Sequence, residues 1–171
     1  AAERYGCDII LTGDGTRLNA LLQGRGAGHI TIVPTTEVVT MEDKPSTAVR
    51  QKKDSSMSVG LRMLAEGQAD AMISAGSTGA LLTGATLLVK RVKGIRRAAM
   101  GPAMPNKAGG KTVIVDCGAN AECTPEFLLQ FGLVGSVYAK KQLGVENPKV
   151  GLLNIGTEDS KGTALQKEAY A

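Results

Sequence analysis

Between residues 71 and 80 the chain reads Ala71-Met72-Ile73-Ser74-Ala75-Gly76-Ser77-Thr78-Gly79-Ala80. A short apolar run leads here into a glycine-rich polar turn and then into an apolar helix. The pattern predicts a buried strand over residues 71–74 and a helix from the turn to about residue 92. Glycines in such a turn let the backbone approach a ligand closely, and a helix N-terminus presents free N–H groups with partial positive charge.

This turn is a candidate phosphate site, because an anion is the natural ligand of such N–H groups. The residues expected to bind it are Ser74, Gly76, Ser77, Thr78 and Gly79. An alternative is that Gly76 and Gly79 only permit tight packing of the strand against the helix. The turn is not a P-loop, because the Gly-Lys-Ser/Thr ending of that motif is missing.

Strands and helices alternate along the rest of the 171 residues, with further strands expected over residues 7–11, 29–33, 112–116 and 149–155. This alternation predicts a single α/β domain in three layers, a mostly parallel sheet with helices on both faces. In such sheets, ligands bind beyond the carboxyl ends of the strands. We therefore expect four glycine-rich turns that follow strands directly to meet at one edge and form one site; they begin at Thr12, Ser74, Asp116 and Gly156.

Local signals predict where several helices begin and end. Thr124 followed by Pro125 indicates a helix start, and Gly144 indicates its end. Ser55 and Ser56 are candidate N-caps for an earlier helix, since a serine hydroxyl can accept from an orphan backbone N–H. Residues 94–111 hold glycine, proline and basic residues and are expected to form a long loop.

The turn over residues 156–162 combines two acids, a lysine and hydroxyl side chains. Lys161 is expected near a helix N-terminus, where the helix dipole disfavours a cation, so an anionic ligand would explain its presence. The alternative is a solvated lysine paired with Glu158 or Asp159. The second part of the expected site is formed by residues of this turn: Gly156, Thr157, Glu158, Asp159 and Lys161.

The turn over residues 116–120 is the third part. Asp116 ends an apolar strand, where a charge is costly unless it is paired or hydrogen-bonded. Gly118 follows, and Asn120 offers both a donor and an acceptor. Asp116 has an alternative role as a helix cap or turn anchor. Nothing in the spacing of the acids in these turns requires a metal ion, so neither a metal nor another cofactor is expected.

Composition limits the classes of function. The chain is 43% hydrophobic and 21% charged, which is typical of an ordered globular protein, and its net charge is +4. Only 3% of residues are aromatic, so the stacking platforms of a single-stranded nucleic-acid binder are missing and no nucleic-acid partner is expected. No signal peptide and no apolar run of the roughly 20 residues needed for a membrane span are visible.

Isolated reactive side chains give little indication of catalysis. Three cysteines, Cys7, Cys117 and Cys123, have no metal-binding spacing and are interpreted as reduced thiols of a cytoplasmic protein. His29 has no partner histidine and is interpreted as structural. The basic residues over 50–53 and 90–93 are either solvated helix ends or contacts for an acidic partner.

Four stretches resemble the bacterial phosphate acyltransferase family of phospholipid synthesis: residues 50–57, 73–81, 116–120 and 151–162. Their order and spacing agree along essentially the whole chain. The resemblance implies a fold like that of isocitrate and isopropylmalate dehydrogenases, a homodimer, and conversion of acyl–acyl carrier protein and inorganic phosphate to acyl-phosphate and free carrier protein. It further implies a cytoplasmic protein, either soluble or peripheral at the inner membrane face, that supplies a membrane-bound glycerol-3-phosphate acyltransferase.

Members of that family are about twice as long. The chain lacks their opening strand with its Asp-Ala-Met-Gly-Gly-Asp motif and their C-terminal half, so it is interpreted as an incomplete portion of a longer protein. Many members carry Asn where Ser77 stands, and Arg97-Ala98-Ala99 stands where the family has Arg-Pro-Ala.

For this chemistry we expect Lys161 to hold phosphate or the oxyanion and Asn120 to orient the substrate. Lys52 and Lys53 are candidate contacts for acyl carrier protein. One alternative is a phosphate acetyltransferase that uses acyl-coenzyme A; another is a non-catalytic phosphate- or acyl-binding module. A dinucleotide-dependent dehydrogenase is disfavoured, because no Gly-x-Gly-x-x-Gly follows the first strand.

Overall fold

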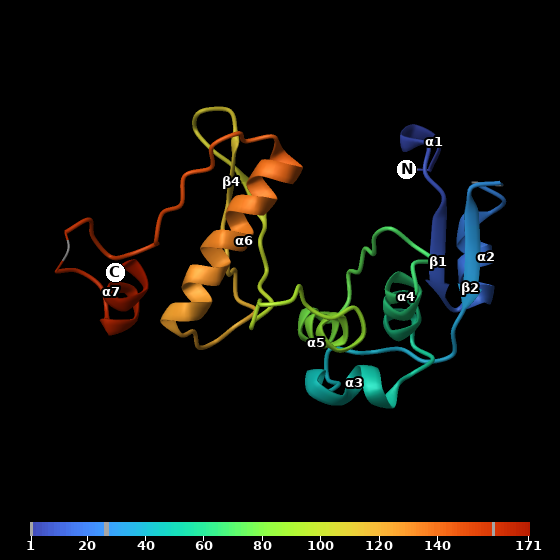
Figure 1. Cartoon of the computed structure of the whole chain (residues 1–171). Helices are drawn as coiled ribbons and strands as arrows, with labels where there is room; N and C mark the ends of the chain where they lie inside the picture. The colour runs from blue at the N-terminus through green and yellow to red at the C-terminus, as the bar shows by residue number, and fades with distance from the viewer. Residues whose placement is uncertain (1, 26–27, 159) are drawn as a thin grey trace. The chain divides into compact units, whose positions relative to one another are not determined.

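The computed structural model describes residues 2–25, 28–158 and 160–171 (Figure 1). The chain is an α/β protein and divides into two compact units, Ala1–Lys90 and Arg91–Ala171. Each unit contains its own strands and helices. The two are described in turn.

The first unit begins with α1 (Ala2–Tyr5) and is built on a parallel strand pair. β1 (Ile9–Gly13) and β2 (Ile30–Pro34) pair in a register that runs from Ile9 opposite Ile30 to Gly13 opposite Pro34. The connecting helix α2 (Gly15–Leu22) packs on both strands, as Figure 1 shows. Asp14 caps it by accepting from the Arg17 N–H at 3.1 Å. The strands predicted over 7–11 and 29–33 are confirmed, each shifted slightly toward the C-terminus.

Three helices pack together to form the core of this unit: α3 (Pro45–Gln51), α4 (Ser56–Ala65) and α5 (Thr78–Leu88). The core side chains are small or flexible, as expected from a composition poor in aromatics: Ala48, Val49, Met57, Leu61 and Ala80. Ser55 is the N-cap of α4, as predicted, and its hydroxyl also contacts that of Ser58 at 2.9 Å.

A glycine allows these helices to approach closely. A Cβ atom at Gly84 of α5 would lie 2.5 Å from Cδ1 of Leu61 and 2.9 Å from Cγ2 of Val49. Both distances are shorter than any normal carbon–carbon contact. The α3–α4–α5 core can therefore form at this spacing only because residue 84 has no side chain.

Two predictions for this unit are wrong. Residues 71–74 are not a strand: no described backbone group pairs with them, and Ile73 is 98% exposed. A strand needs a neighbouring strand to satisfy its backbone groups, and an apolar sequence alone does not supply one. The helix that follows ends at Leu88 rather than near 92, because Lys90 adopts a left-handed backbone conformation with φ of 73°.

The second unit contains an antiparallel hairpin. β3 (Ala103–Pro105) pairs with β4 (Lys111–Val113), and the turn between them is closed by Asn106, whose Oδ1 accepts from the N–H groups of Ala108 and Gly110. The predicted long loop over 94–111 therefore contains a strand. The strand predicted over 112–116 is present only at its start, and its partner is antiparallel rather than parallel.

The longest helix, α6 (Pro125–Leu143), follows the prediction at both ends. Thr124 caps it by accepting from the Phe127 N–H at 3.3 Å, and Gly144 ends it with φ of 69°. Phe131 is its buried residue. The helix α7 (Ala164–Tyr170) begins with a capping box between Thr163 and Gln166.

The strand predicted over residues 149–155 is wrong. No described residue pairs with this segment, and Leu153 and Ile155 are 88% and 86% exposed. As for residues 71–74, the segment is rich in apolar residues, but no described strand lies beside it to pair with it. Of the four glycine-rich turns, those at Thr12 and Ser74 belong to the first unit and those at Asp116 and Gly156 to the second. Their meeting at one edge stays a prediction.

Candidate functional site

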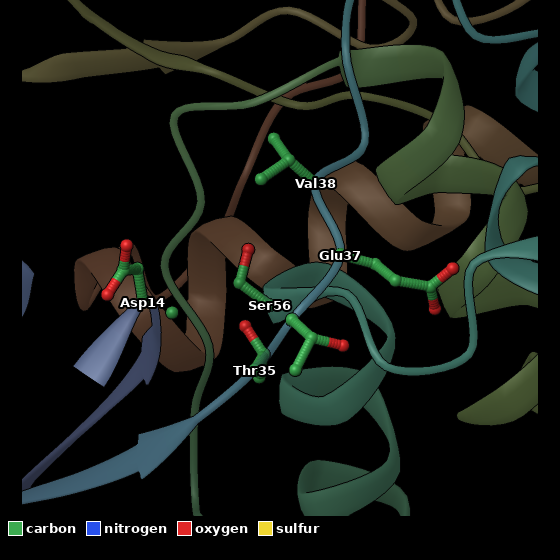
Figure 2. A pocket seen from close by; sticks show the side chains of 7 residues that line it. Asp14, Thr35, Glu37, Val38 and Ser56 are labelled. Carbon is green, nitrogen blue, oxygen red and sulfur yellow. The ribbon is translucent and has the colours of Figure 1, made fainter. Parts of the chain in front are cut away.

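A pocket of about 350 Å³ lies in the first unit, beyond the carboxyl ends of both parallel strands. Gly13 and Asp14 line it after β1, residues 35–38 line it after β2, and Ser56 lines it at the first residue of α4. This is the place where parallel sheets bind ligands. Figure 2 shows the side chains of Thr35 and Ser56 near each other and that of Asp14 to one side of them, whereas the side chain of Glu37 extends away in the opposite direction.

Hydrogen bonds fix the segment that forms one wall of this pocket. The N–H and hydroxyl of Thr36 both donate to Oδ2 of Asp54, and the Asp54 N–H donates to Oε2 of Glu37 at 2.8 Å. These bonds from the Thr36 hydroxyl and N–H hold the pKa of the Asp54 carboxyl below its usual value. The Thr12 hydroxyl donates to the carbonyl of Ser56 at 3.0 Å and thereby ties β1 to α4.

Sequence patterns predict only part of this pocket: they indicate the turn at Thr12 as part of a ligand site but not Thr35, Thr36 or Ser56. The signal for Thr35 was available, since it follows β2 as directly as Asp14 follows β1, and the same rule about carboxyl ends applies to both.

The turn over residues 74–79 is in the same unit. The Ser74 hydroxyl accepts from the Gly76 N–H at 3.2 Å, and buried Ser77 caps α5 by accepting from the Ala80 N–H at 3.4 Å. No acceptor among the described residues bonds the N–H groups of Thr78 and Gly79, so these two could meet an anion.

The glycines of this turn also serve packing. A Cβ at Gly79 would lie 3.0 Å from Cγ of Pro45 in α3, and one at Gly76 would lie 3.2 Å from Cε of Met57. The alternative weighed for Gly76 and Gly79 therefore has direct support. A packing role and an anion-binding role are compatible, because packing uses the Cα positions and an anion would use the N–H groups.

In the second unit, Asp116 anchors the turn that it begins. Its Oδ1 accepts from the Met100 N–H at 2.7 Å, and its Oδ2 accepts from the N–H and Nδ2 of Asn120 at 2.7 and 3.1 Å. Partial burial raises the pKa of the Asp116 carboxyl, but these hydrogen bonds outweigh that effect and leave the pKa below its usual value. The amide nitrogen of Asn120 also donates to the carbonyl of Ala98 at 2.9 Å, so both its hydrogens are used.

The loop over residues 156–162 is held by Asn154, which donates to the carbonyl of Lys161 at 3.3 Å. A Cβ at Gly156 would lie 2.7 Å from Oε2 of Glu158 and 2.9 Å from Cγ of Lys161, so both side chains fold over this glycine. No ion pair joins the Lys161 ammonium to a described carboxylate, although the pairing with Glu158 was one alternative. Asp159 lies outside the described residues.

The remaining predicted site residues occupy varied surroundings. Thr157 is exposed, and Gly118 has φ of 92° with open space where a side chain would stand. Lys52 is held inside the first unit: its Nζ lies 2.6 Å from Oδ2 of Asp43 and 2.8 Å from the carbonyl oxygen of Val38. The hydrogen bond from Lys52 is the main cause that lowers the pKa of Asp43. Lys53 is exposed.

Across the part of the chain that the structure describes, no three His, Cys, Asp or Glu side chains gather in a way that could hold a metal ion. Among the helices within residues 2–25, 28–158 and 160–171, none combines the length and apolar character that a membrane crossing requires.

The fold and these turns define an α/β protein with polar, glycine-rich candidate sites at the ends of strands and the starts of helices. The sequence profile of the family described as "Fatty acid synthesis protein" matches residues 1–171. The chain therefore belongs to this family.

Individual relatives are similar over nearly the whole chain. The phosphate acyltransferase of Alkaliphilus oremlandii is 50% identical over an alignment of 172 positions that covers 99% of this chain and 51% of that protein. Those of Clostridioides difficile and Thermoanaerobacterium thermosaccharolyticum are 48% and 44% identical, again over 99% of this chain and 51% and 50% of the respective proteins. The chain spans about half the length of the curated relatives it matches.

Proposed function

We propose that this chain is part of an acyltransferase that converts acyl–acyl carrier protein and inorganic phosphate to acyl-phosphate and free carrier protein. The observation that carries this proposal is the 44–50% identity to phosphate acyltransferases over 99% of the chain. At that level of identity, the turns that resemble the family are expected to keep their chemistry. The proposal includes the three-layer, dehydrogenase-like arrangement for the complete protein.

The reaction transfers an acyl group from sulfur to oxygen. A phosphate oxygen attacks the thioester carbonyl, the carbonyl oxygen becomes an oxyanion, and the carbon–sulfur bond then breaks and releases the carrier thiol. Phosphate is itself a competent nucleophile, so the protein has to position it and stabilise the oxyanion. Lys161 is the candidate for that stabilisation, since no described carboxylate neutralises its ammonium group.

Asn120 is proposed to bind phosphate as an acceptor. Both hydrogens of its amide nitrogen are used by Ala98 and Asp116, and its Oδ1 has no hydrogen bond among the described residues. A carbonyl oxygen accepts from the O–H of monohydrogen phosphate. The turn over residues 74–79, the glycines Gly118 and Gly156, and the side chains of Thr157, Glu158 and Asp159 are proposed to complete the phosphate and substrate contacts.

The partners follow from the same proposal. They are acyl carrier protein, inorganic phosphate, a second copy in a homodimer, and a membrane-bound glycerol-3-phosphate acyltransferase that uses the product. The proposed location is the cytoplasm, with peripheral contact to the inner membrane face.

The test measures acyl-phosphate formation from palmitoyl–acyl carrier protein and phosphate by the intact gene product that contains this chain. Acetyl-coenzyme A is supplied in a parallel reaction. Acyl-phosphate from the carrier-bound substrate supports the proposal. Product from acetyl-coenzyme A alone favours the acetyltransferase alternative, and product from neither substrate contradicts the assignment to acyl transfer.

A further inference from the structure

The pocket beyond β1 and β2 is lined by a buried threonine whose hydroxyl has no described protein partner. Thr35 is only 8% exposed, and its backbone N–H donates to the carbonyl of Gly13 at 2.8 Å. The Thr35 hydroxyl makes no hydrogen bond to any described residue. Every fully enclosed side-chain oxygen among the described residues does have a partner, so the Thr35 hydroxyl is not fully enclosed. The Thr35 hydroxyl therefore faces accessible space, and the space that Thr35 lines is the pocket.

Two other residues with an unbonded polar atom line the same pocket from different elements. Asp14 uses Oδ1 to cap α2, which leaves Oδ2 without a described partner. The hydroxyl of Ser56, at the first residue of α4, makes no hydrogen bond to a described residue. Asp14, Thr35 and Ser56 thus line one pocket from the end of β1, the end of β2 and the start of α4, with Asp14 to one side of the two hydroxyl residues (Figure 2).

This combination favours an amide over a phosphate. An amide offers an N–H, which a carboxylate accepts, and a carbonyl, to which hydroxyls donate. A phosphate would gain from the hydroxyls and from the α4 N-terminus, but it would meet the Asp14 carboxylate, and no described lysine or arginine pairs with that carboxylate. The volume of about 350 Å³ is at the lower end of the roughly 300–1,000 Å³ usual for ligand sites, which suits a segment of a ligand.

We propose that this pocket binds the amide-bearing pantetheine arm of the acyl donor, with an amide N–H on Asp14 and an amide carbonyl or hydroxyl on Thr35 and Ser56. The identification of the arm rests on the proposed function, because an acyl donor carried on a thioester requires such an arm. Acyl carrier protein and coenzyme A share this chemistry. The charged phosphate end of the arm lies outside the pocket, away from Asp14.

The proposal is tested by calorimetry, which measures the affinity of the intact gene product for pantetheine and for inorganic phosphate. One substitution should change these two affinities in a direction that distinguishes the two ligands. Asp14→Asn keeps the cap of α2, since Asn is as good an N-cap as Asp, but removes the charge. Pantetheine binding should weaken about fivefold, the difference between a charged and a neutral acceptor. A pocket that holds phosphate would give the opposite result, tighter phosphate binding, and would overturn the proposal. Asp70→Asn, an exposed change of equal charge, is the control.

Thr35→Val removes the hydroxyl with little change of shape and should weaken pantetheine binding about fivefold, while Thr35→Ser restores it. Thr31→Val, at an exposed position of β2, is the matched control. Wild-type protein that does not bind pantetheine, or Thr35→Val protein that binds it normally, overturns the proposal. If Thr35→Val does not fold, Asp14→Asn alone decides.

Two further comparisons test pantetheine binding in the pocket separately from the proposed acyltransferase function. Tighter binding of holo- than of apo-acyl carrier protein would identify the carrier as the source of the arm, and tighter binding of coenzyme A would identify the nucleotide form. Acyl-phosphate formation that Asp14→Asn and Thr35→Val leave unaltered, with an unaltered Michaelis constant for the carrier, contradicts the pocket inference alone. Pocket-dependent pantetheine binding without acyl-phosphate formation contradicts the proposed function alone.

Discussion

Asn120 donates two hydrogen bonds to one carboxylate oxygen of Asp116, from its backbone N–H at 2.7 Å and from its side-chain Nδ2 at 3.1 Å. Asp116 therefore fixes both the backbone and the side chain of a candidate catalytic residue. Its own Oδ1 is occupied by the Met100 N–H. A substitution at Asp116 is consequently expected to act on stability and on the position of Asn120 together.

The first prediction concerns stability. Asp116→Asn leaves one oxygen to accept and places an amide where two donors point, so the free energy of unfolding should fall by about 1–3 kcal/mol. Urea denaturation of the intact gene product measures this loss. Glu146→Gln, an exposed change of equal charge in the same unit, should leave the urea midpoint unchanged. Equal midpoints for wild type and Asp116→Asn would show that the anchor contributes nothing.

The second prediction concerns pH. Hydrogen bonds hold the folded-state pKa of Asp116 below its ordinary value of 3.8. The stabilisation from the charged carboxylate is therefore complete above about pH 4–5 and is lost as the pH falls through the lowered folded-state pKa. The difference in urea midpoint between wild type and Asp116→Asn should thus shrink as the pH is lowered from 7 to 3. A difference that is constant over this range would contradict the assigned role of the charge.

The third prediction separates two adjacent lysines. Lys52 is paired with Asp43 and Val38, whereas Lys53 is exposed. Lys52→Met should lower the urea midpoint, and Lys53→Met should not. A carrier-protein contact is therefore better tested at Lys53 alone, where Lys53→Glu should raise the Michaelis constant for acyl carrier protein several-fold, because charge reversal at an interface rim acts on association. An unchanged constant would remove Lys53 from the proposed interface.

The fourth prediction concerns Lys161. Removal of one well-placed group that stabilises an oxyanion costs about 100-fold or more in rate. Lys161→Ala should therefore reduce acyl-phosphate formation by at least that factor while the urea midpoint stays near that of wild type, because the side chain is exposed. Lys167→Ala, at an exposed position of α7, is the control. Near-normal turnover in Lys161→Ala would exclude a catalytic role.

Helix ends were the most predictable part of the fold. Each helix end is set by hydrogen bonds to residues within a few positions in the sequence, so the local sequence contains the whole signal. This holds for the N-caps Ser55 and Thr124 and for the C-cap Gly144. Strand predictions depended on partners instead. Residues 9–13 and 30–34 have each other, but residues 71–74 and 149–155 have the right apolar pattern and no described neighbour. The β3–β4 hairpin was missed because a side-chain turn at Asn106, rather than apolar periodicity, defines it.

The candidate sites divide in the same way. The chemical types of Asp116, Asn120 and Lys161 identified them from the sequence, and the structure adds which of their atoms are already bonded. Thr35 and Ser56 have unremarkable local sequences. The position of Thr35 directly after β2 was available from the sequence, but the burial of Thr35 and the approach of Ser56 from α4 to the same pocket depend on the tertiary fold.

The absence of a side chain at Gly84 determines the order in which the α3–α4–α5 core can tolerate substitutions. Alanine is favoured over glycine in a helix by about 1 kcal/mol, but overpacking costs about 1–3 kcal/mol, so Gly84→Ala alone should be destabilising. In a background in which both Leu61 and Val49 are replaced by alanine, the clashes with Cδ1 of Leu61 and Cγ2 of Val49 both disappear, and the same change should become stabilising. The order of substitution then matters: a lineage can acquire alanine at 84 after residues 49 and 61 have become smaller, but not before. Position 84 is therefore a site of sign epistasis, where the history of the core decides whether an identical mutation is purged or retained.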